Sequence, residues 1–139
     1  MDFLGITITK VNPIMTEKGI TYEWSKGVPG LQVNIYNRKK GRISGNHFHK
    51  GDDPSKNPER FFLIQGRMRL RARNRQGETM EAFVEEGTEL LIDPWVFHAL
   101  EALTDVIFIE YRSTIFNKKK PDTYSEREFA VLLREKFTK

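Results

Sequence analysis

Short apolar runs make up most of this chain, and glycine, proline, asparagine and aspartate separate them. Runs of this length and spacing predict a sandwich or barrel of antiparallel strands. Hairpin turns are predicted at about 74–77 and 85–88, and a tight connection at 104–105. We expect strands at about residues 3–11, 20–24, 31–37, 43–49, 60–73, 79–84, 89–92, 97–103 and 106–112.

The hydrophobic period changes near the C-terminus. Ser125 and Glu128 have the spacing of a helix capping box, and apolar residues then recur at helical spacing. We therefore expect one amphipathic helix at about 125–137, after a linker over 114–124. Its apolar stripe should cover the open side of the barrel or a partner subunit. The stripe consists of Phe129, Leu132, Leu133 and Phe137.

Every second residue from 67 to 73 is an arginine, and the residues between them are apolar. In a strand this pattern places the guanidinium groups on one face and the apolar groups on the other. The alternation favours a solvated outer face. The alternative is a row of guanidinium groups that binds phosphate.

Length and composition indicate a single domain spanning residues 1–139. A chain of 139 residues with 38% hydrophobic content can bury a core without disulfides. It has no cysteine, which excludes thiolate ligands and thiol nucleophiles. We find no apolar run of about 18 residues and no charged-then-apolar leader, so we expect no membrane partner, no signal peptide and a cytoplasmic location.

The net charge changes this picture little. The 23 basic residues are balanced by 19 acidic ones, which leaves +4 on a surface of mixed sign. No helical or aromatic recognition motif accompanies the charge, so we expect no nucleic-acid partner.

All three histidines of the chain can be assigned to one site. His47 and His49 are two apart and would share a strand face, while a strand beginning at Glu59 could bring its carboxylate beside them. His98 follows a Pro-Trp turn. This set suits a metal or acid/base site, although Asp52 or Asp53 could replace Glu59. The plainer alternative is polar residues in a barrel interior without metal.

The spacing of these residues resembles that of the cupin motifs. Gly41, His47, His49, Glu59 and Gly66 follow the first motif, with a longer loop before the glutamate. Gly87 and His98 keep the overall spacing of the second motif, in which Trp95 replaces a glycine. The resemblance implies an all-β cupin fold, a double-stranded β-helix or jelly-roll barrel over about 1–113, with the C-terminal α-helix appended. Trp95 and Phe97 would then line the mouth that His98 faces.

Longer segments resemble sugar-nucleotide enzymes. GNHFHKG, ERFFLIQG, WVFHAL and TIFNKKKPDT are similar to the cupin domain of capsular-polysaccharide UDP-sugar epimerases, and TEKGITYEW to dTDP-sugar 3,4-ketoisomerases. The resemblance implies an isomerase or epimerase of a nucleotide-linked keto sugar in surface polysaccharide biosynthesis. Where these relatives have an arginine before the first histidine, this chain has Ser44. Arg42 or Arg60 would bind phosphate instead, and Trp95 would contact the substrate.

The resemblance makes His47, His49, Glu59 and His98 the ligands of a divalent metal ion such as Zn, Fe, Ni or Mn. Three imidazoles and one carboxylate leave a coordination position open, where a metal can polarise a carbonyl. An unbound member of the three histidines would be catalytic, and a tyrosine could donate the proton. The candidate tyrosines are Tyr22, Tyr36 and Tyr111.

Two other functions remain open. The same ligand set with iron would suit a cupin dioxygenase, and a sugar- or metal-binding cupin would do no chemistry. We also expect a homodimer, because strand edges and an amphipathic helix in a small domain favour pairing.

Overall fold

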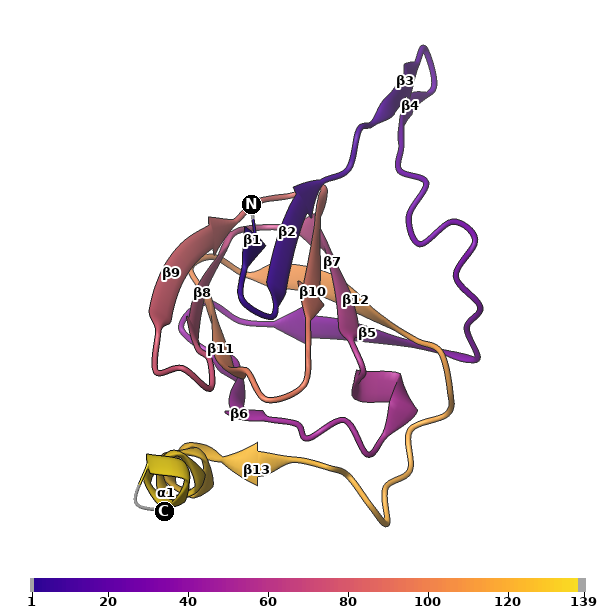
Figure 1. The fold of residues 1–139 in the computed structure, drawn as a ribbon. Coiled ribbons are helices and arrows are strands. Elements are labelled where there is room, and N and C mark those ends of the chain that lie inside the picture. Colours follow the sequence, from indigo (N-terminus) through magenta and orange to yellow (C-terminus); the bar gives the residue numbers. More distant parts are fainter. Residues whose placement is uncertain (1, 138–139) are drawn as a thin grey trace.

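The computed structural model describes residues 2–137, with side chains up to residue 134. Two antiparallel sheets face each other and form a jelly-roll barrel (Figure 1). The six-stranded sheet has the order β1-β2-β10-β7-β12-β5, and the five-stranded sheet has the order β13-β6-β11-β8-β9. The strands are β1 (Asp2–Phe3), β2 (Ile6–Lys10), β3 (Ile14–Thr16), β4 (Gly19–Thr21), β5 (Gln32–Arg38), β6 (Ile43–Phe48), β7 (Glu59–Gln65), β8 (Met68–Arg73), β9 (Thr79–Val84), β10 (Thr88–Ile92), β11 (Phe97–Ala102), β12 (Val106–Arg112) and β13 (Tyr124–Ser125).

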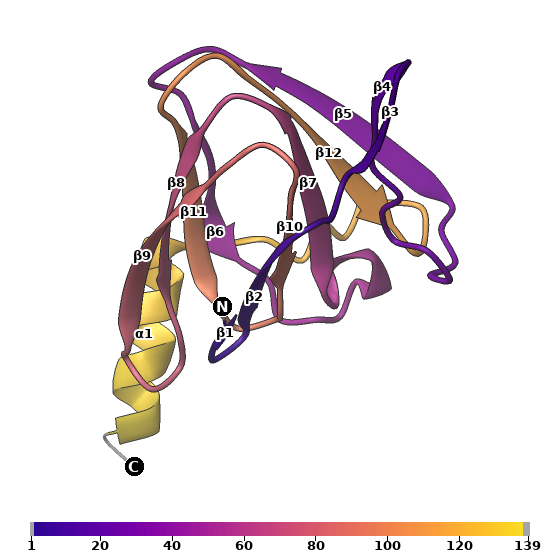
Figure 2. The same ribbon diagram turned by 90° about the horizontal axis from the view of Figure 1, so that it is seen from above.

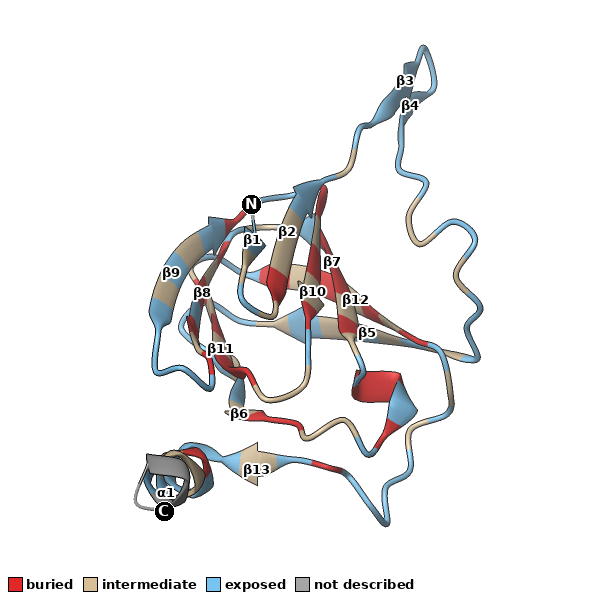
Figure 3. Ribbon diagram, in the orientation of Figure 1, coloured by how far each residue is buried: buried red, intermediate tan, exposed pale blue. Residues whose placement is uncertain are grey.

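The core fills the space between the two sheets, and buried residues alternate with more exposed ones along many of the strands (Figure 3). Figure 2 shows the two layers and the connections that pass between them. The predicted all-β barrel with one C-terminal helix is therefore confirmed. The buried apolar residues include Ile6, Leu63, Met68, Leu70, Val84, Leu90, Ile92, Leu100, Val106 and Phe108.

The arginines of β8 lie on the outer face of the five-stranded sheet. Arg69 contacts Glu101 and Glu81, and Arg71 Nε lies 3.3 Å from a Glu81 oxygen. Their charges are thus neutralised on a surface that faces away from the barrel interior. The solvated-face interpretation holds, and the phosphate-binding row finds no support.

The C-terminal helix α1 (Glu126–Phe137) packs outside the five-stranded sheet. The capping box is present, since the Glu128 N–H donates to Ser125 Oγ at 3.2 Å and the Ser125 N–H donates to the Glu128 carboxylate. Phe129 is buried against the outward-facing rings of Phe48 and Phe97. The apolar stripe therefore covers the outer face of its own barrel; the side chain of Phe137 lies outside the described residues.

Several predicted strand boundaries are wrong where the chain passes from one sheet to the other. The predicted strand 60–73 is two strands, β7 and β8, which belong to different sheets. Gly66 lies between them with φ of 94°, and a Cβ there would be 2.4 Å from the Asp105 carbonyl oxygen. The predicted hairpin at 85–88 likewise joins β9 to β10 across the two sheets. The apolar pattern continues through each crossing, so periodicity alone does not reveal it.

Other elements differ at the N-terminus and in the linker. The predicted strand 3–11 is interrupted by a turn between β1 and β2, and the predicted strand 20–24 is reduced to β4, which pairs with β3. The sequence did not predict β13 or the short 3₁₀ helix Pro54–Lys56. The hairpin at 74–77 is confirmed by the Asn74 N–H, which donates to the Glu78 carbonyl at 3.0 Å.

Among the described residues, no helix has the length and apolar character needed to cross a membrane.

The inward and outward positions of β8 should differ sharply in their contribution to stability. We expect Leu70→Ala, which empties a fully buried position, to lower the free energy of unfolding by about 2–5 kcal/mol. The neighbouring substitution Arg71→Ala removes only an exposed ion pair and should cost less than about 1 kcal/mol. Urea unfolding followed by circular dichroism measures both; equal losses would contradict the register of β8.

Candidate metal and catalytic centre

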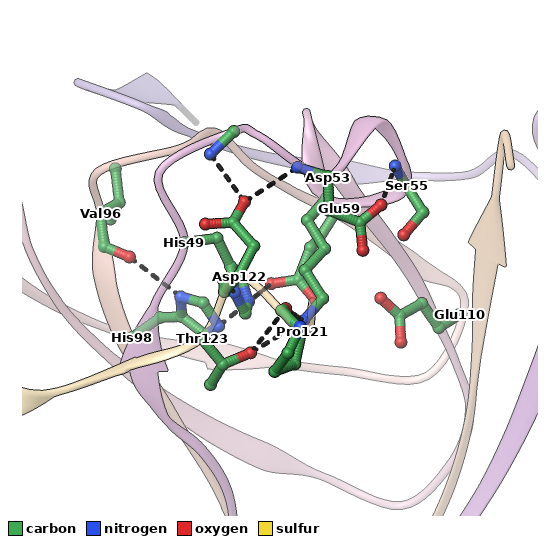
Figure 4. A network of polar contacts seen from close by, with 12 residues as sticks. His49, Asp53, Ser55, Glu59, Val96, His98, Glu110, Pro121, Asp122 and Thr123 are labelled. Atoms are coloured by element: carbon green, nitrogen blue, oxygen red, sulfur yellow. Dashed lines mark hydrogen bonds and ion pairs between the residues drawn. The ribbon is translucent and has the colours of Figure 1, made fainter. Parts of the chain in front are cut away.

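The three histidines and Glu59 converge inside the barrel from both sheets, and Figure 4 shows His49, Glu59 and His98 of this group. His47 on β6 lies directly opposite His98 on β11, and their ring centroids are 4.9 Å apart. His49 follows the end of β6, and Glu59 begins β7 of the other sheet. One ligand atom from each of the four residues lies within 4.8 Å of all the others.

The backbone approaches closely at this point, and a glycine makes this possible. Gly45 on β6 has φ of 83°, and a Cβ there would lie 3.1 Å from His98 Cδ2. The pairing of β6 with β11 also shifts register after His98. The local irregularity lets His47 and His98 share the interior without a clash.

Two backbone carbonyls fix the tautomers of two histidines. His49 Nδ1 lies 2.7 Å from the Asp122 carbonyl oxygen, and His98 Nδ1 lies 3.0 Å from that of Val96 (Figure 4). A carbonyl oxygen only accepts, so each Nδ1 carries the hydrogen. Both rings consequently direct an Nε2 lone pair into the site, which is the usual arrangement of metal-binding histidines.

The carboxylate of Glu59 faces these lone pairs. Its Oε1 lies 2.7 Å from His49 Nε2 and 3.2 Å from His98 Nε2, and all three side chains are buried. Neither Glu59 Oε1 nor His49 Nε2 has a hydrogen bond of acceptable geometry. Acceptor atoms face each other here, so the arrangement requires a proton or a cation between them.

A divalent metal ion fits this donor set. Metal–nitrogen and metal–oxygen distances of about 2.0–2.2 Å place neighbouring ligand atoms roughly 3 Å apart, close to the two separations at Glu59. Imidazole and carboxylate donors without thiolate suit Zn, Fe, Ni or Mn.

The charge states of the cluster also suit a metal. Burial, together with the charges of His98 and His49, lowers the pKa of His47 to about 3. Burial alone would raise the pKa of Glu59, but hydrogen bonding and charge interaction with His49 and His98 in their protonated forms hold it well below its usual range. A neutral imidazole and an ionised carboxylate are the forms that coordinate metal ions.

Glu59 is the carboxylate that reaches the histidines, and the two loop aspartates do not. Asp53 instead caps the 3₁₀ helix by accepting a hydrogen bond from the Ser55 N–H at 2.9 Å. Asp52 is exposed. The longer loop therefore keeps the motif glutamate in the site.

The cluster lies in a pocket of about 260 Å³. Across from it, a Tyr36 hydroxyl donates to Glu110 Oε1 at 2.7 Å, and Arg112 Nη2 donates to the same oxygen at 2.8 Å. Arg112 also donates to Ser55 Oγ at 3.0 Å. The remaining wall includes Arg38, Ile43, Ser44, Gly45, Lys56, Phe61, Leu100 and Phe108.

Burial and the neighbouring charges raise the pKa values of the acidic groups in this wall. Burial, together with the charge of Glu59, raises the pKa of Glu110 to about 8. Burial and the Glu110 charge also raise the pKa of Tyr36, so its phenol stays protonated at neutral pH. Sequence reasoning missed Glu110 and Arg112. The available signal was two charged residues in the inward phase of β12, after the apolar Val106 and Phe108.

The structure separates the three candidate tyrosines. Tyr36 lines the pocket. Tyr22 packs on Phe62, which points outward from β7, and Tyr111 donates its hydroxyl to the Val28 carbonyl on the same outer side. Only Tyr36 of these three can reach a molecule bound beside the histidines.

The predicted substrate-binding residues do not line this pocket. Arg42 is exposed before β6, and Arg60 points outward, 3.9 Å from Glu89. Trp95 packs against Phe48 on the side of α1, and its neighbour Phe97 also points there. The expectation that Trp95 and Phe97 line the mouth in front of His98 is therefore wrong. Phe97 precedes His98 on β11 and faces the opposite side of the sheet, and Trp95, in the turn before this strand, packs on that same side. Arg38, which the sequence analysis did not single out, lines the pocket instead.

Comparisons with known proteins place this fold and site in context. The profile of a family described as "Polysaccharide biosynthesis C-terminal domain" matches residues 15–124. A search of curated proteins finds no match.

Solved structures share the fold. A variant of the 3,4-ketoisomerase QdtA from Thermoanaerobacterium thermosaccharolyticum, in complex with TDP-4-keto-6-deoxyglucose, has a TM-score of 0.76 at 13% identity; the match covers 99% of this chain and 100% of that one. The dTDP-4-dehydrorhamnose 3,5-epimerase of Sulfolobus tokodaii gives 0.70 at 21% identity, covering 87% and 76%. These likenesses confirm the cupin-type jelly roll.

A capsular polysaccharide assembling protein, CapF from Staphylococcus aureus, is similar at 27% identity with a TM-score of 0.59. The match covers 83% of this chain and 32% of CapF. This chain thus corresponds to about a third of that protein's length.

We expect purified protein to carry close to one divalent metal ion per chain, held by the three histidines and Glu59. His47→Ala combined with His98→Ala should abolish this content, since only two ligands remain. Elemental analysis of untagged protein measures it. Asp52→Asn, which changes an exposed loop carboxylate, is the matched control and should keep the metal. Metal that survives loss of both histidines would refute the site.

The lowered pKa of His47 predicts how stability depends on pH in metal-free protein. Its pKa falls from 6.5 in the unfolded chain to about 3 in the fold, so the unfolded chain binds more protons between these values. The free energy of unfolding should therefore fall as pH drops below 6.5. Glu59 acts in the same direction at lower pH. Urea unfolding in chelator at about pH 7.5 and about pH 5 should show a smaller difference for His47→Gln than for the native chain; equal differences would contradict the assignment.

Proposed function

The chain belongs to the polysaccharide biosynthesis C-terminal domain family, and from this premise we propose that it is a metal-dependent isomerase or epimerase of a nucleotide-linked keto sugar. One observation carries the proposal. Three histidines and a glutamate converge on one side of a pocket whose other side presents a protonated tyrosine. A Lewis-acid site and a proton donor that face each other suit the movement of a proton next to a carbonyl.

The four residues His47, His49, Glu59 and His98 would hold the metal ion. When bound there, a divalent ion supplies a Lewis acid that polarises the sugar carbonyl and makes the neighbouring C–H more acidic. The chain itself would hold the ligand side chains in fixed orientations. The Asp122 and Val96 carbonyls hold the rings of His49 and His98 in place.

Tyr36 moves the proton in this proposal. Its hydroxyl is 2.7 Å from Glu110, and that carboxyl is itself held by Arg112. Tyr36 would take the proton from the sugar carbon while its own phenolic proton passes to the ionised form of Glu110, and the reverse transfer would return one proton to the sugar. The substrate loses one proton and regains one, so the reaction involves no net oxidation.

The pocket limits what can bind beside the metal ligands. A volume of about 260 Å³ lies below the range of roughly 300–1,000 Å³ that buries a drug-sized ligand. The site therefore suits a single sugar ring, while the nucleotide stays outside the barrel. Phe61, Leu100 and Phe108 supply an apolar wall that excludes water from the sugar.

Arg38 would bind the phosphates at the pocket. Its guanidinium carbon lies 5.0 Å from the centre of the Tyr36 ring, and the side chain is half-buried. Among the described residues it has no carboxylate partner, whereas Arg60 contacts Glu89. A guanidinium fork matches phosphate oxygens, so we assign to Arg38 the role first expected of Arg42 or Arg60.

Proton exchange tests the function. In deuterated water with a UDP- or dTDP-linked 4-keto-6-deoxy sugar, the metal-loaded protein should incorporate deuterium next to the carbonyl. Tyr36→Phe should slow this by at least about 100-fold, since general acid/base groups contribute factors of this size. His49→Asn should abolish it. Mass spectrometry of the recovered sugar measures the exchange.

The matched control is Tyr22→Phe, which removes a hydroxyl on the outer side of the barrel and should exchange at the native rate. Arg38→Ala should raise KM and leave the rate at saturating substrate nearly unchanged, because it removes binding away from the reacting carbon. Full exchange by Tyr36→Phe would refute the proton role. Absence of exchange, together with oxygen consumption by an iron-loaded sample, would favour a dioxygenase; sugar binding without either would indicate a binding module.

A further inference from the structure

A row of polar side chains follows the inward face of β5 and ends at Tyr36. Gln32, Asn34 and Tyr36 are half-buried and alternate with exposed residues, so all three point to the same side of the strand. Asn34 lies directly opposite Glu110 on β12. Of the described residues that line the pocket, Tyr36 is one, whereas Asn34 and Gln32 are not. Both amides would therefore act on a bound sugar through the tyrosine.

Hydrogen bonds join this row from end to end. The Phe116 N–H in the linker donates to Gln32 Oε1 at 2.8 Å, and Gln32 Nε2 donates to Asn34 Oδ1 at 2.8 Å. Asn34 Nδ2 then donates to the Tyr36 hydroxyl oxygen at 3.0 Å, and that hydroxyl donates to Glu110 at 2.7 Å. The chain of bonds thus extends from the backbone of the linker to a carboxylate in the pocket wall.

The linker end of this chain sets the direction of the bonds that follow. A backbone N–H can only donate, so Gln32 turns its carbonyl oxygen toward Phe116 and its NH2 group toward Asn34. Asn34 accepts this bond with its oxygen, which turns its own NH2 group toward Tyr36. Turning either amide over would bring two acceptors or two donors face to face.

The same direction decides where the phenol places its single hydrogen. The Tyr36 oxygen accepts the N–H of Asn34, so the phenolic hydrogen lies on another bond. Glu110 Oε1 offers that bond at 2.7 Å. Arg112, which only donates, contacts the same oxygen at 2.8 Å and keeps it an acceptor. The hydrogen of Tyr36 is thus directed to Glu110.

We propose that Asn34 and Gln32 are positioning residues that hold the hydrogen of the Tyr36 phenol on its bond to Glu110. This inference rests on the proposed function, in which the phenol oxygen takes a proton from the sugar carbon while its own proton passes to the ionised form of Glu110. One proton enters the phenol and one leaves it, so the transfer requires the outgoing hydrogen to lie toward Glu110 beforehand. Burial and the charge of Glu110 raise the pKa of Tyr36, and the Asn34 bond opposes them because it stabilises negative charge on the phenol oxygen.

The substitution Gln32→Glu tests the direction of the chain. The new side chain keeps its shape and still accepts the Phe116 N–H, but its second oxygen cannot donate to Asn34. The Phe116 N–H and the guanidinium of Arg112, opposite on β12, favour its ionised form. The Asn34 amide should then turn over, so that its NH2 group donates to residue 32 and its oxygen accepts the hydrogen of Tyr36.

Nuclear Overhauser effects measure this change without any substrate. In native protein, the side-chain NH2 group of Asn34 should give cross-peaks to the Tyr36 ring. In Gln32→Glu, cross-peaks to the methylene groups of residue 32 should replace them.

The rate of proton exchange measures the consequence for the reaction. Gln32→Glu and Asn34→Leu should each slow deuterium incorporation at saturating substrate by at least about tenfold and leave KM within about twofold, because they act on proton transfer and not on binding. In the double variant the two losses should not add, since Asn34→Leu already removes the amide through which residue 32 acts. Asn34→Asp keeps the shape of the side chain but draws the phenol hydrogen to itself, so it should slow exchange at least as much as Asn34→Leu.

Asn37→Asp is the matched control. It makes the same change of charge on the same strand, but its side chain is exposed on the outer face, so the exchange rate and the Asn34 cross-peaks should stay native. Native cross-peaks of Asn34 in Gln32→Glu would overturn the proposal, and so would losses that add in full in the double variant or a native rate in Asn34→Asp. If native protein exchanges no keto sugar, the proposed function and this role in it both fail, while the cross-peaks still show whether the amides direct the phenol hydrogen.

Discussion

The buried contact of Glu59 with His49 and His98 is the constraint on which the rest of the site depends. An ionised carboxylate taken out of water costs several kcal/mol unless a positive charge compensates it. The Nδ1–H groups of both rings donate to the Asp122 and Val96 carbonyls. Each ring therefore presents an Nε2 lone pair, and not an N–H group, to that carboxylate. This arrangement suits a cation or a shared proton at this point.

The C-terminal segment holds this arrangement from outside the barrel. The Asp122 carboxylate accepts hydrogen bonds from the N–H groups of Lys50, Gly51 and Asp53, and these bonds lower its pKa although burial opposes them. Lys56 donates to Thr123 Oγ1 at 2.8 Å. β13 then pairs with β6 beside His47, and Phe129 of α1 anchors the segment. The linker and helix therefore position the buried histidines.

The candidate ligand set could be predicted from the sequence, but the residues of the pocket wall opposite it could not. Four of the site's residues could be predicted because motif spacing and strand parity place His47, His49, His98 and Glu59 on inward positions. Parity also predicted the outward arginines of β8. Tyr36 remained one of three candidates, since choosing it requires the register between β5 and β12, where it neighbours Phe108.

Other errors have the same origin in three-dimensional connectivity. Trp95 was placed at the pocket by its proximity to His98 in sequence, but its left-handed backbone, with φ of 65°, turns the ring toward Phe48. The crossings at Gly66 and Gly87 keep an apolar pattern on both sides, so local periodicity could not reveal that the chain changes sheets there.

The two faces of β5 lie in different surroundings. Tyr36 points into the pocket, while Val33 and Ile35 point to the uncovered outer face. Within the described residues β5 is an edge strand that pairs with β12 alone. The position of Tyr36 is fixed inside the pocket, where its ring stacks on Phe108 and its hydroxyl donates to Glu110, whose same oxygen accepts from Arg112. Because catalysis depends on positioning within fractions of an ångström, these contacts would hold the phenol in place for the proposed proton transfer.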